Sequence, residues 1–130
     1  MKHRLWLVIA LLGVMALTPG CSNGPSLEGT WTATSARPQT LVADAAVTLT
    51  FAEGRVSGTA GCNRFMCAYS VSGGLLKAPQ LASTLMFCGG PRGEQETWVM
   101  ALLSSSPTVS VDGGTLVLTG ATATLTFRRG

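Results

Sequence analysis

The sequence is poor in histidine, since the only one among its 130 residues is His3. Without a second histidine, the chain beyond its first few residues has no Ser-His or Cys-His pair for nucleophilic catalysis and no imidazole to bind a metal. It also lacks a Walker phosphate loop and a dinucleotide-binding glycine fingerprint. We therefore expect a protein that is not an enzyme, with no catalytic residues, no metal and no cofactor.

Charged residues are also scarce, at 12% of the chain. Lys2 and Arg4 lie at the very start; of the nine basic residues, seven then remain against six acidic ones, a net charge of +1. The only adjacent basic pair is Arg128-Arg129, which we expect to be a solvated tail. Because no basic stripe is present, we predict no nucleic-acid partner.

Residues 5–17, "LWLVIALLGVMAL", form an uninterrupted apolar run of 13 residues. This is the length of a signal-peptide core and is shorter than the roughly 18 residues of a spanning helix. The following "LTPGC" places a small residue before Cys21, as in bacterial lipoprotein signals. We predict a lipoprotein signal peptide over residues 1–20, lipidation of Cys21 and a short linker over 21–26. An ordinary secretory signal cut near a cysteine is the alternative.

Either signal implies export into the bacterial cell envelope. With Cys21 lipidated, the protein would be anchored to a membrane, on its periplasmic or outer side, because acyl chains bury their methylene groups in the bilayer. The remaining chain is long enough for one domain with a single modest core, which we assign to residues 27–130.

From Ser26 onward, apolar and polar residues alternate with the period of two that is typical of half-buried strands. Glycine-containing turns such as Asp112-Gly113-Gly114 separate these runs at hairpin spacing. The pattern predicts strands over residues 27–34, 47–51, 55–59, 65–71, 75–78, 84–87, 108–111 and 115–127, the last with a turn at Gly120.

Residues 92–107, "RGEQETWVMALLSSSP", have a helical pattern instead. Glu94 and Glu96 are placed at the expected helix start, where the helix dipole favours acids, and Pro107 prevents continuation. The residues expected to face the core are Trp98, Val99 and Leu102. Short hairpin-linked strands with one apolar face must close on something. We therefore predict a mainly β fold with one α-helix, in which a small, partly open antiparallel β-barrel is closed by an inserted helix.

Cys62, Cys67 and Cys88 remain once Cys21 is assigned to the anchor. In an oxidising compartment close thiols form disulfides, and an odd number leaves one thiol unpaired. Cys62 has two possible partners, and Cys67 competes with it for Cys88. A zinc site with three thiolates is a further alternative, and a reactive Cys67 whose pKa is lowered by Arg64 is another.

Four stretches resemble the META domain, which occurs in HslJ-like heat-shock lipoproteins of bacteria and in a kinetoplastid protein. They are "LEGTW" at 27–31, "FAEGRVSGTAGCNRF" at 51–65, Tyr69 and "LASTLMFC" at 81–88. The resemblance implies a cracked β-barrel with an inserted helix, similar to pilot lipoproteins of type III secretion. It implies no established catalytic activity and a loose link to envelope stress and antibiotic tolerance.

The resemblance also assigns roles to residues. It pairs Cys62 with Cys88 and leaves Cys67, which stands where the family usually has glycine, as a free or alternative thiol. Leu85 stands where a basic or polar residue is common. The motif residues expected to be structural are Gly29, Trp31, Gly61, Asn63, Phe65, Tyr69, Thr84 and Met86. Independently of the resemblance, Asn63 is expected at a positive-φ turn position, and Phe65, Tyr69 and Val71 are expected in the core by their period-two spacing.

Three functions fit these observations. The first is a binding or structural role in the envelope, with an envelope protein or a small hydrophobic ligand as partner. The second is thiol redox chemistry or sensing by Cys67 with Cys62 or Cys88. The third is inhibition of a secreted hydrolase through an exposed loop, for which residues 91–93 and 36–46 are the candidates.

Overall fold

The computed structural model of the protein describes residues 26–130. The predicted signal peptide, Cys21 and nearly all of the linker over 21–26 lie outside this range. The strands are β1 Gly29–Arg37, β2 Thr48–Ala52, β3 Arg55–Thr59, β4 Arg64–Ala68, β5 Ser70–Ser72, β6 Leu75–Lys77, β7 Ala82–Ser83, β8 Thr108–Asp112, β9 Thr115–Thr119 and β10 Thr124–Arg129, and the helix is α1 Gly90–Ser104. No helix within the described residues has both the length and the apolar content that crossing a bilayer requires.

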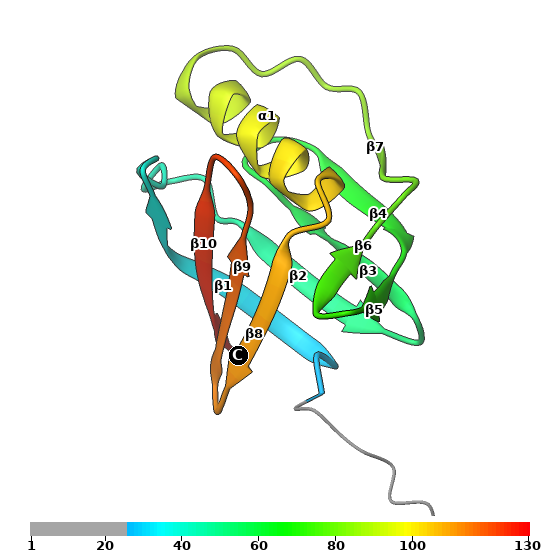
Figure 1. Cartoon of the computed structure of the whole chain (residues 1–130). Helices are drawn as coiled ribbons and strands as arrows, with labels where there is room; N and C mark the ends of the chain where they lie inside the picture. The colour runs from blue at the N-terminus through cyan, green and yellow to red at the C-terminus, as the bar shows by residue number, and fades with distance from the viewer. Residues whose placement is uncertain (1–25) are drawn as a thin grey trace, which may run out of the picture.

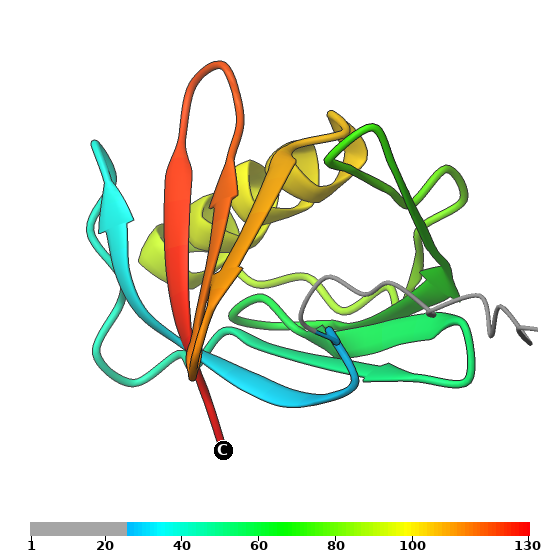
Figure 2. The same ribbon diagram turned by 60° about the horizontal axis from the view of Figure 1, so that its bottom comes forward.

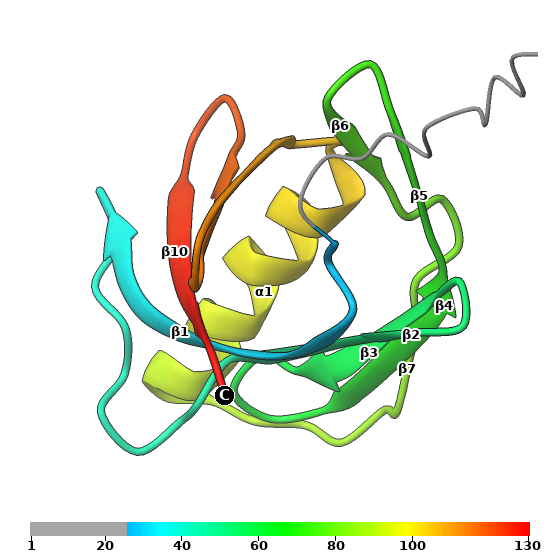
Figure 3. The same cartoon turned by 90° about the horizontal axis from the view of Figure 1, so that it is seen from below.

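The strands form one antiparallel sheet in the order β5-β6-β8-β9-β10-β1-β2-β3-β4-β7. Strand β1 joins the two halves of the sheet. Its residues 29–32 pair with β2, and its residues 31–37 pair with β10, with a register shift between Ala33 and Ser35. Figure 2 shows β1 bending from the side of β8, β9 and β10 towards the side of β2, β3 and β4. Seen from below, the sheet curls into a half-barrel around α1 (Figure 3). The predicted fold class is confirmed.

The open side of the half-barrel lies between the two ends of the sheet (Figure 1). Strands β4 and β5 are consecutive in the chain, but β5 lies at one end of the strand order and β4 lies next to the other end, so the chain crosses this opening at Tyr69. The main-chain N–H of Tyr69 donates to the carbonyl of Gly54, and its ring packs edge-on against Phe51 with the ring centroids 4.8 Å apart. The crack in the barrel is therefore narrowed by one aromatic residue.

The core is formed by the inward faces of the strands and by one face of α1. The largest fully buried apolar side chains are Trp31, Leu49, Phe51, Leu76, Leu103, Leu116, Leu118, Leu125 and Phe127. The helix buries Gln95, Val99, Leu102 and Leu103. Trp98 is only partly buried, and the polar Gln95 takes a buried place that the apolar pattern did not indicate.

Several local predictions are wrong. Residues 84–87 are not a strand, because β7 ends at Ser83 and an irregular segment follows. The helix begins at Gly90, two residues before the predicted start, so that Glu94 and Glu96 lie beyond its first turn. Val71 is exposed because it belongs to β5, which lies at the end of the strand order.

Arg129 is not a solvated tail residue. Its guanidinium carbon lies 4.2 Å from the ring centroid of Trp31, and its two terminal nitrogens donate to the carbonyls of Glu28 and Ser26. The indole N–H of Trp31 donates to the carbonyl of Leu27 at 2.8 Å. A cation over an aromatic face contributes about 0.5–2 kcal/mol. Arg129 thus fixes the segment that enters β1.

Candidate functional site

The most exposed large apolar side chains lie in the 84–88 loop, which we define as residues Thr84 to Cys88 between β7 and α1. Leu85 and Phe87 are each 96% exposed, and Met86 is 61% exposed. Met66 on the adjoining strand β4 is also exposed, and β4 pairs with β7 just before the loop. Contiguous exposed apolar surface of this kind marks an interaction site more often than isolated apolar residues do.

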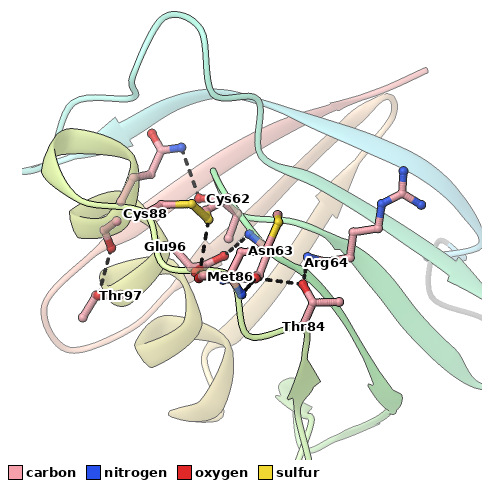
Figure 4. The surroundings of a disulfide bond; sticks show 11 residues. Cys62, Asn63, Arg64, Thr84, Met86, Cys88, Glu96 and Thr97 are labelled. Atoms are coloured by element: carbon pink, nitrogen blue, oxygen red, sulfur yellow. Dashed lines mark hydrogen bonds between the residues drawn. A yellow bond between two sulfur atoms is a disulfide. The ribbon is translucent and has the colours of Figure 1, made fainter.

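The loop is held by the side chain of Asn63, which is buried in the turn between β3 and β4 (Figure 4). Its Nδ2 donates to the carbonyl of Met86 at 3.0 Å, and its Oδ1 accepts from the main-chain N–H of Met86 at 2.7 Å. The same Oδ1 accepts from the hydroxyl of Thr84 at 2.8 Å. One amide therefore satisfies both main-chain polar groups of Met86, as a neighbouring strand would.

Glu96 on α1 fixes the orientation of Asn63. Its Oε2 accepts from Asn63 Nδ2 at 2.7 Å, and its Oε1 accepts from the main-chain N–H of Asn63 at 2.6 Å. Together with the contacts to the loop, these bonds use both donors and both acceptor positions of the Asn63 amide. Because the acceptor is a carboxylate, the two bonds are stronger than neutral ones. Thr84, Asn63, Met86 and Glu96 thus form a closed polar network under an apolar loop.

A disulfide between Cys62 and Cys88 holds the far end of the loop, with the two Cα atoms 6.2 Å apart. The pairing implied by the family resemblance is confirmed. In the chain-entropy model, a cross-link over 26 residues contributes about 3 kcal/mol. Position 93 near this disulfide requires glycine, because a Cβ there would overlap the carbonyl oxygen of Cys88. The loop is therefore fixed at Met86 by hydrogen bonds and at Cys88 by a covalent bond.

Gln95 ties α1 to the rest of the barrel. Its Oε1 accepts from the main-chain N–H of Val42 at 2.7 Å, and its Nε2 donates to the carbonyls of Ala45 and Ala60 at 2.7 and 3.2 Å. The neighbouring Gly61 has a φ of 134°, where a side chain would be strained and would press on Gln95. The helix that carries Glu96 is consequently a rigid support for the loop.

Cys67 is the free cysteine of the described residues, and its side chain is buried on β4. Burial raises the pKa of its thiol, and the charge of Arg55 opposes this only in part. The hypothesis of a thiol activated by Arg64 is therefore wrong, because burial disfavours the thiolate. Within residues 26–130, no group of three or more histidine, cysteine or acidic residues is placed to hold a metal ion.

The sequence-predicted residues fall into two groups. Gly61, Cys62, Asn63, Thr84, Met86 and Cys88 come together at the loop. Gly29, Trp31, Phe65 and Cys67 lie on strands of the barrel wall, and Tyr69 lies in the segment that crosses the opening. Asn63 does not have the expected positive φ, which is found at Gly61.

The roles of Glu96 and Gln95 were not predicted from the sequence, in which Glu96 was expected only as an acid at the helix start and Gln95 was not singled out. No local signal distinguishes them, because both lie within the polar run over residues 94–97 that precedes the apolar helical stripe. Of the proposed inhibitory segments, residues 91–93 lie in the first turn of α1 and are not a free loop.

Comparisons with known proteins agree with this architecture. The model of the META domain family matches residues 25–130. A protein from Burkholderia xenovorans solved by NMR is 27% identical, with a TM-score of 0.66, over 79% of this chain and 82% of its own. A second NMR structure is 28% identical, with a TM-score of 0.68, over 78% of this chain and 89% of its own. A search of curated proteins gave no match.

Proposed function

We propose that this chain, which belongs to the META domain family, is a non-catalytic binding protein of the bacterial cell envelope. The observation that carries the proposal is the 84–88 loop, in which Leu85 and Phe87 are almost completely exposed on a braced backbone. Burying one such side chain against a partner contributes about 1.5–3 kcal/mol.

The bonds that hold the loop backbone in place distinguish it from a flexible loop whose apolar side chains are exposed without a function. A flexible apolar loop would fold back onto the protein, or would lose conformational entropy on binding. Here Asn63, Glu96 and the disulfide Cys62–Cys88 already hold the loop in one conformation. The cost of ordering it is met during folding, so that most of the contact energy of the two apolar side chains is available to a partner.

The proposed location depends on the sequence. The signal peptide over residues 1–20, the lipid on Cys21 and the linker over 21–26 would tether the domain to a membrane of the envelope. The disulfide Cys62–Cys88 supports export, because such bonds persist in oxidising compartments. A role in envelope stress or antibiotic tolerance would follow from the family and from a partner at the loop.

An envelope protein is better supported as the partner than a small hydrophobic ligand inside the barrel. Val99, Leu102 and Leu103 of α1 are buried in the core, so that apolar side chains already fill the space beneath the helix. The thiol-redox alternative is also less well supported. Cys62 and Cys88 are paired with each other, and the Cys67 thiol is buried with a raised pKa.

Two measurements test the proposal. Mass spectrometry of the membrane-extracted chain should show an acylated Cys21 as the first residue; an unmodified chain that keeps residues 1–20 would contradict the location. A photo-crosslinking amino acid placed at position 87 in cells should give a discrete protein adduct. The same amino acid at Thr122, which is exposed between β9 and β10, is the control, and equal labelling from both positions would contradict a binding role for the loop.

A further inference from the structure

We infer that the 84–88 loop is a substrate-like inhibitory loop for a serine endopeptidase whose primary pocket accepts apolar side chains, with Phe87 as the residue that enters this pocket. The inference rests on the proposed function, since it names the class of partner that the loop binds. It differs from the two inhibitory segments that the sequence suggested, because neither of them carries the exposed apolar residues.

The main-chain hydrogen bonding of the loop alternates. Both polar groups of Met86 are bonded to Asn63. Within residues 26–130, the main-chain groups of Leu85 and Phe87 make no hydrogen bond to the protein. An extended peptide that binds as an added strand uses the main chain of alternate residues to pair with its partner. The main-chain groups of Leu85 and Phe87 are therefore free to pair with the edge of a peptidase cleft, while Met86 between them is held by Asn63.

The position and exposure of the Phe87 side chain also fit a substrate-like loop. Phe87 is 96% exposed and directly precedes the disulfide-bonded Cys88, and the helix begins at Gly90. Very little extended chain is thus available after Phe87. The enzyme must recognise the loop mainly through the residue that fills its primary pocket and the residues before it. Serine endopeptidases of the chymotrypsin type set their specificity in this way, through the primary pocket.

The same bonds explain why the loop would inhibit rather than serve as a substrate. Hydrolysis would add water across the Phe87–Cys88 peptide bond, leaving a carboxylate on Phe87 and an amine on Cys88. The amine end stays attached through the disulfide to Cys62, and the carboxylate end stays attached through Met86 to Asn63. Because neither end can leave, product release is slow and the peptide bond can re-form in the cleft.

A lipid bilayer is the main competing occupant of an exposed apolar loop. The unpaired main-chain groups of Leu85 and Phe87 speak against it, because a peptide group without a hydrogen-bond partner is costly to bury in hydrocarbon. A peptidase cleft offers main-chain partners for these groups, and a bilayer does not. The alternating pattern thus favours a protein cleft over a membrane.

The test measures inhibition of peptidases by the chain purified in mild non-ionic detergent. Chymotrypsin and subtilisin, which accept apolar residues, should be inhibited competitively, and trypsin, which needs a basic residue, should not. Phe87→Ala should weaken the inhibition by at least about 30-fold, as expected for a central anchor residue. Phe87→Arg should transfer inhibition to trypsin, and this gain shows that the variant is folded.

Several results would overturn the inference. They are no inhibition of any apolar-specific enzyme, rapid cleavage at Phe87–Cys88 without inhibition, or a Phe87→Arg chain that does not inhibit trypsin. Flotation of the Cys21→Ser chain with vesicles of neutral and anionic phospholipid, abolished by Phe87→Ala, would show a bilayer as the occupant instead, and loss of self-association in Phe87→Ala would show a second copy. A photo-crosslinked envelope partner at position 87 that is not a peptidase would overturn this inference and leave the proposed function standing.

Discussion

The carboxylate of Glu96 accepts one hydrogen bond from the main-chain N–H of Asn63 at 2.6 Å and one from its side-chain Nδ2 at 2.7 Å. This contact joins the helix to the turn between β3 and β4, and it sets which way the Asn63 amide faces. The exposed 84–88 loop depends on that orientation, because Oδ1 and Nδ2 bond different groups of Met86.

Glu96→Ala should destabilise the protein by about 2–3 kcal/mol, because it removes a charged acceptor from two donors of a largely buried network. Glu96→Gln keeps one acceptor and should cost about half as much. The nearby exposed Glu94 has no such contact, so Glu94→Ala should stay within about 0.5 kcal/mol of the natural protein. Urea unfolding measures all three, and equal effects of the two alanine variants would contradict the role of Glu96.

The Asn63 brace predicts a specific pattern of hydrogen exchange in the loop. The amide of Met86 should exchange slowly, because it donates to Oδ1 of Asn63, whereas the amides of Leu85 and Phe87 should exchange fast. In Asn63→Ala the protection at Met86 should be lost. Residue-resolved exchange by NMR under native conditions provides the measurement. Protection of Met86 that survives in Asn63→Ala would show that something else holds the loop.

Reduction of the Cys62–Cys88 bond should cost about 3 kcal/mol of stability, since it frees a chain segment of 26 residues in the unfolded state. The double variant Cys62→Ala/Cys88→Ala should lose a similar amount and should not respond further to reductant. Cys67→Ala is the matched control and should respond to reductant as the natural protein does. Unfolding curves with and without reductant compare them; a control that no longer responds would assign the effect to Cys67.

The buried Cys67 thiol predicts a loss of stability at alkaline pH. Its pKa is raised in the folded protein, so its contribution is fully present below the ordinary thiol pKa and is lost as pH rises from there through the folded-state pKa. Stability measured between pH 7.5 and about 9.5 should therefore fall more in the natural protein than in Cys67→Ala.

The same burial predicts that Cys67 is unreactive. In a Cys21→Ser chain, a thiol reagent should modify Cys67 only after unfolding by guanidinium, because the folded thiol is both covered and protonated. Modification at the same rate before and after unfolding would contradict the buried position of Cys67 and would support the thiol-redox alternative.

The Arg129 contact with Trp31 predicts a stability effect at the surface. Arg129→Ala should cost about 1–2 kcal/mol, because it removes a cation from an aromatic face and leaves the carbonyls of Ser26 and Glu28 to solvent. Its neighbour Arg128 is exposed, with no such contact, and Arg128→Ala should be nearly neutral. The midpoint of thermal unfolding distinguishes the two, and equal midpoints would mean that the stacking contributes nothing.

Structure formed between neighbouring residues could be predicted from the sequence, whereas contacts between residues distant in the chain could not. Period-two alternation predicted the hairpins, since each strand buries one face against the same core. It failed at residues 84–87, whose apolar composition is typical of a strand but whose hydrogen bonds come from the side chain of Asn63, about 20 residues away in the chain. Nothing in a local pattern shows that Glu96 accepts from a residue 33 positions earlier.

The pairing of β1 with β10 has a consequence for synthesis. β1 gains β2 on one edge after a connection over residues 38–47, but its other edge stays unpaired until β10, almost a hundred residues after β1 begins, has been made. A nascent chain that ends before Thr124 thus exposes a strand edge at the centre of the sheet. Folding should be completed late and in one cooperative step, and shortened chains that lack β10 should be removed by proteases instead of accumulating as partly folded domains.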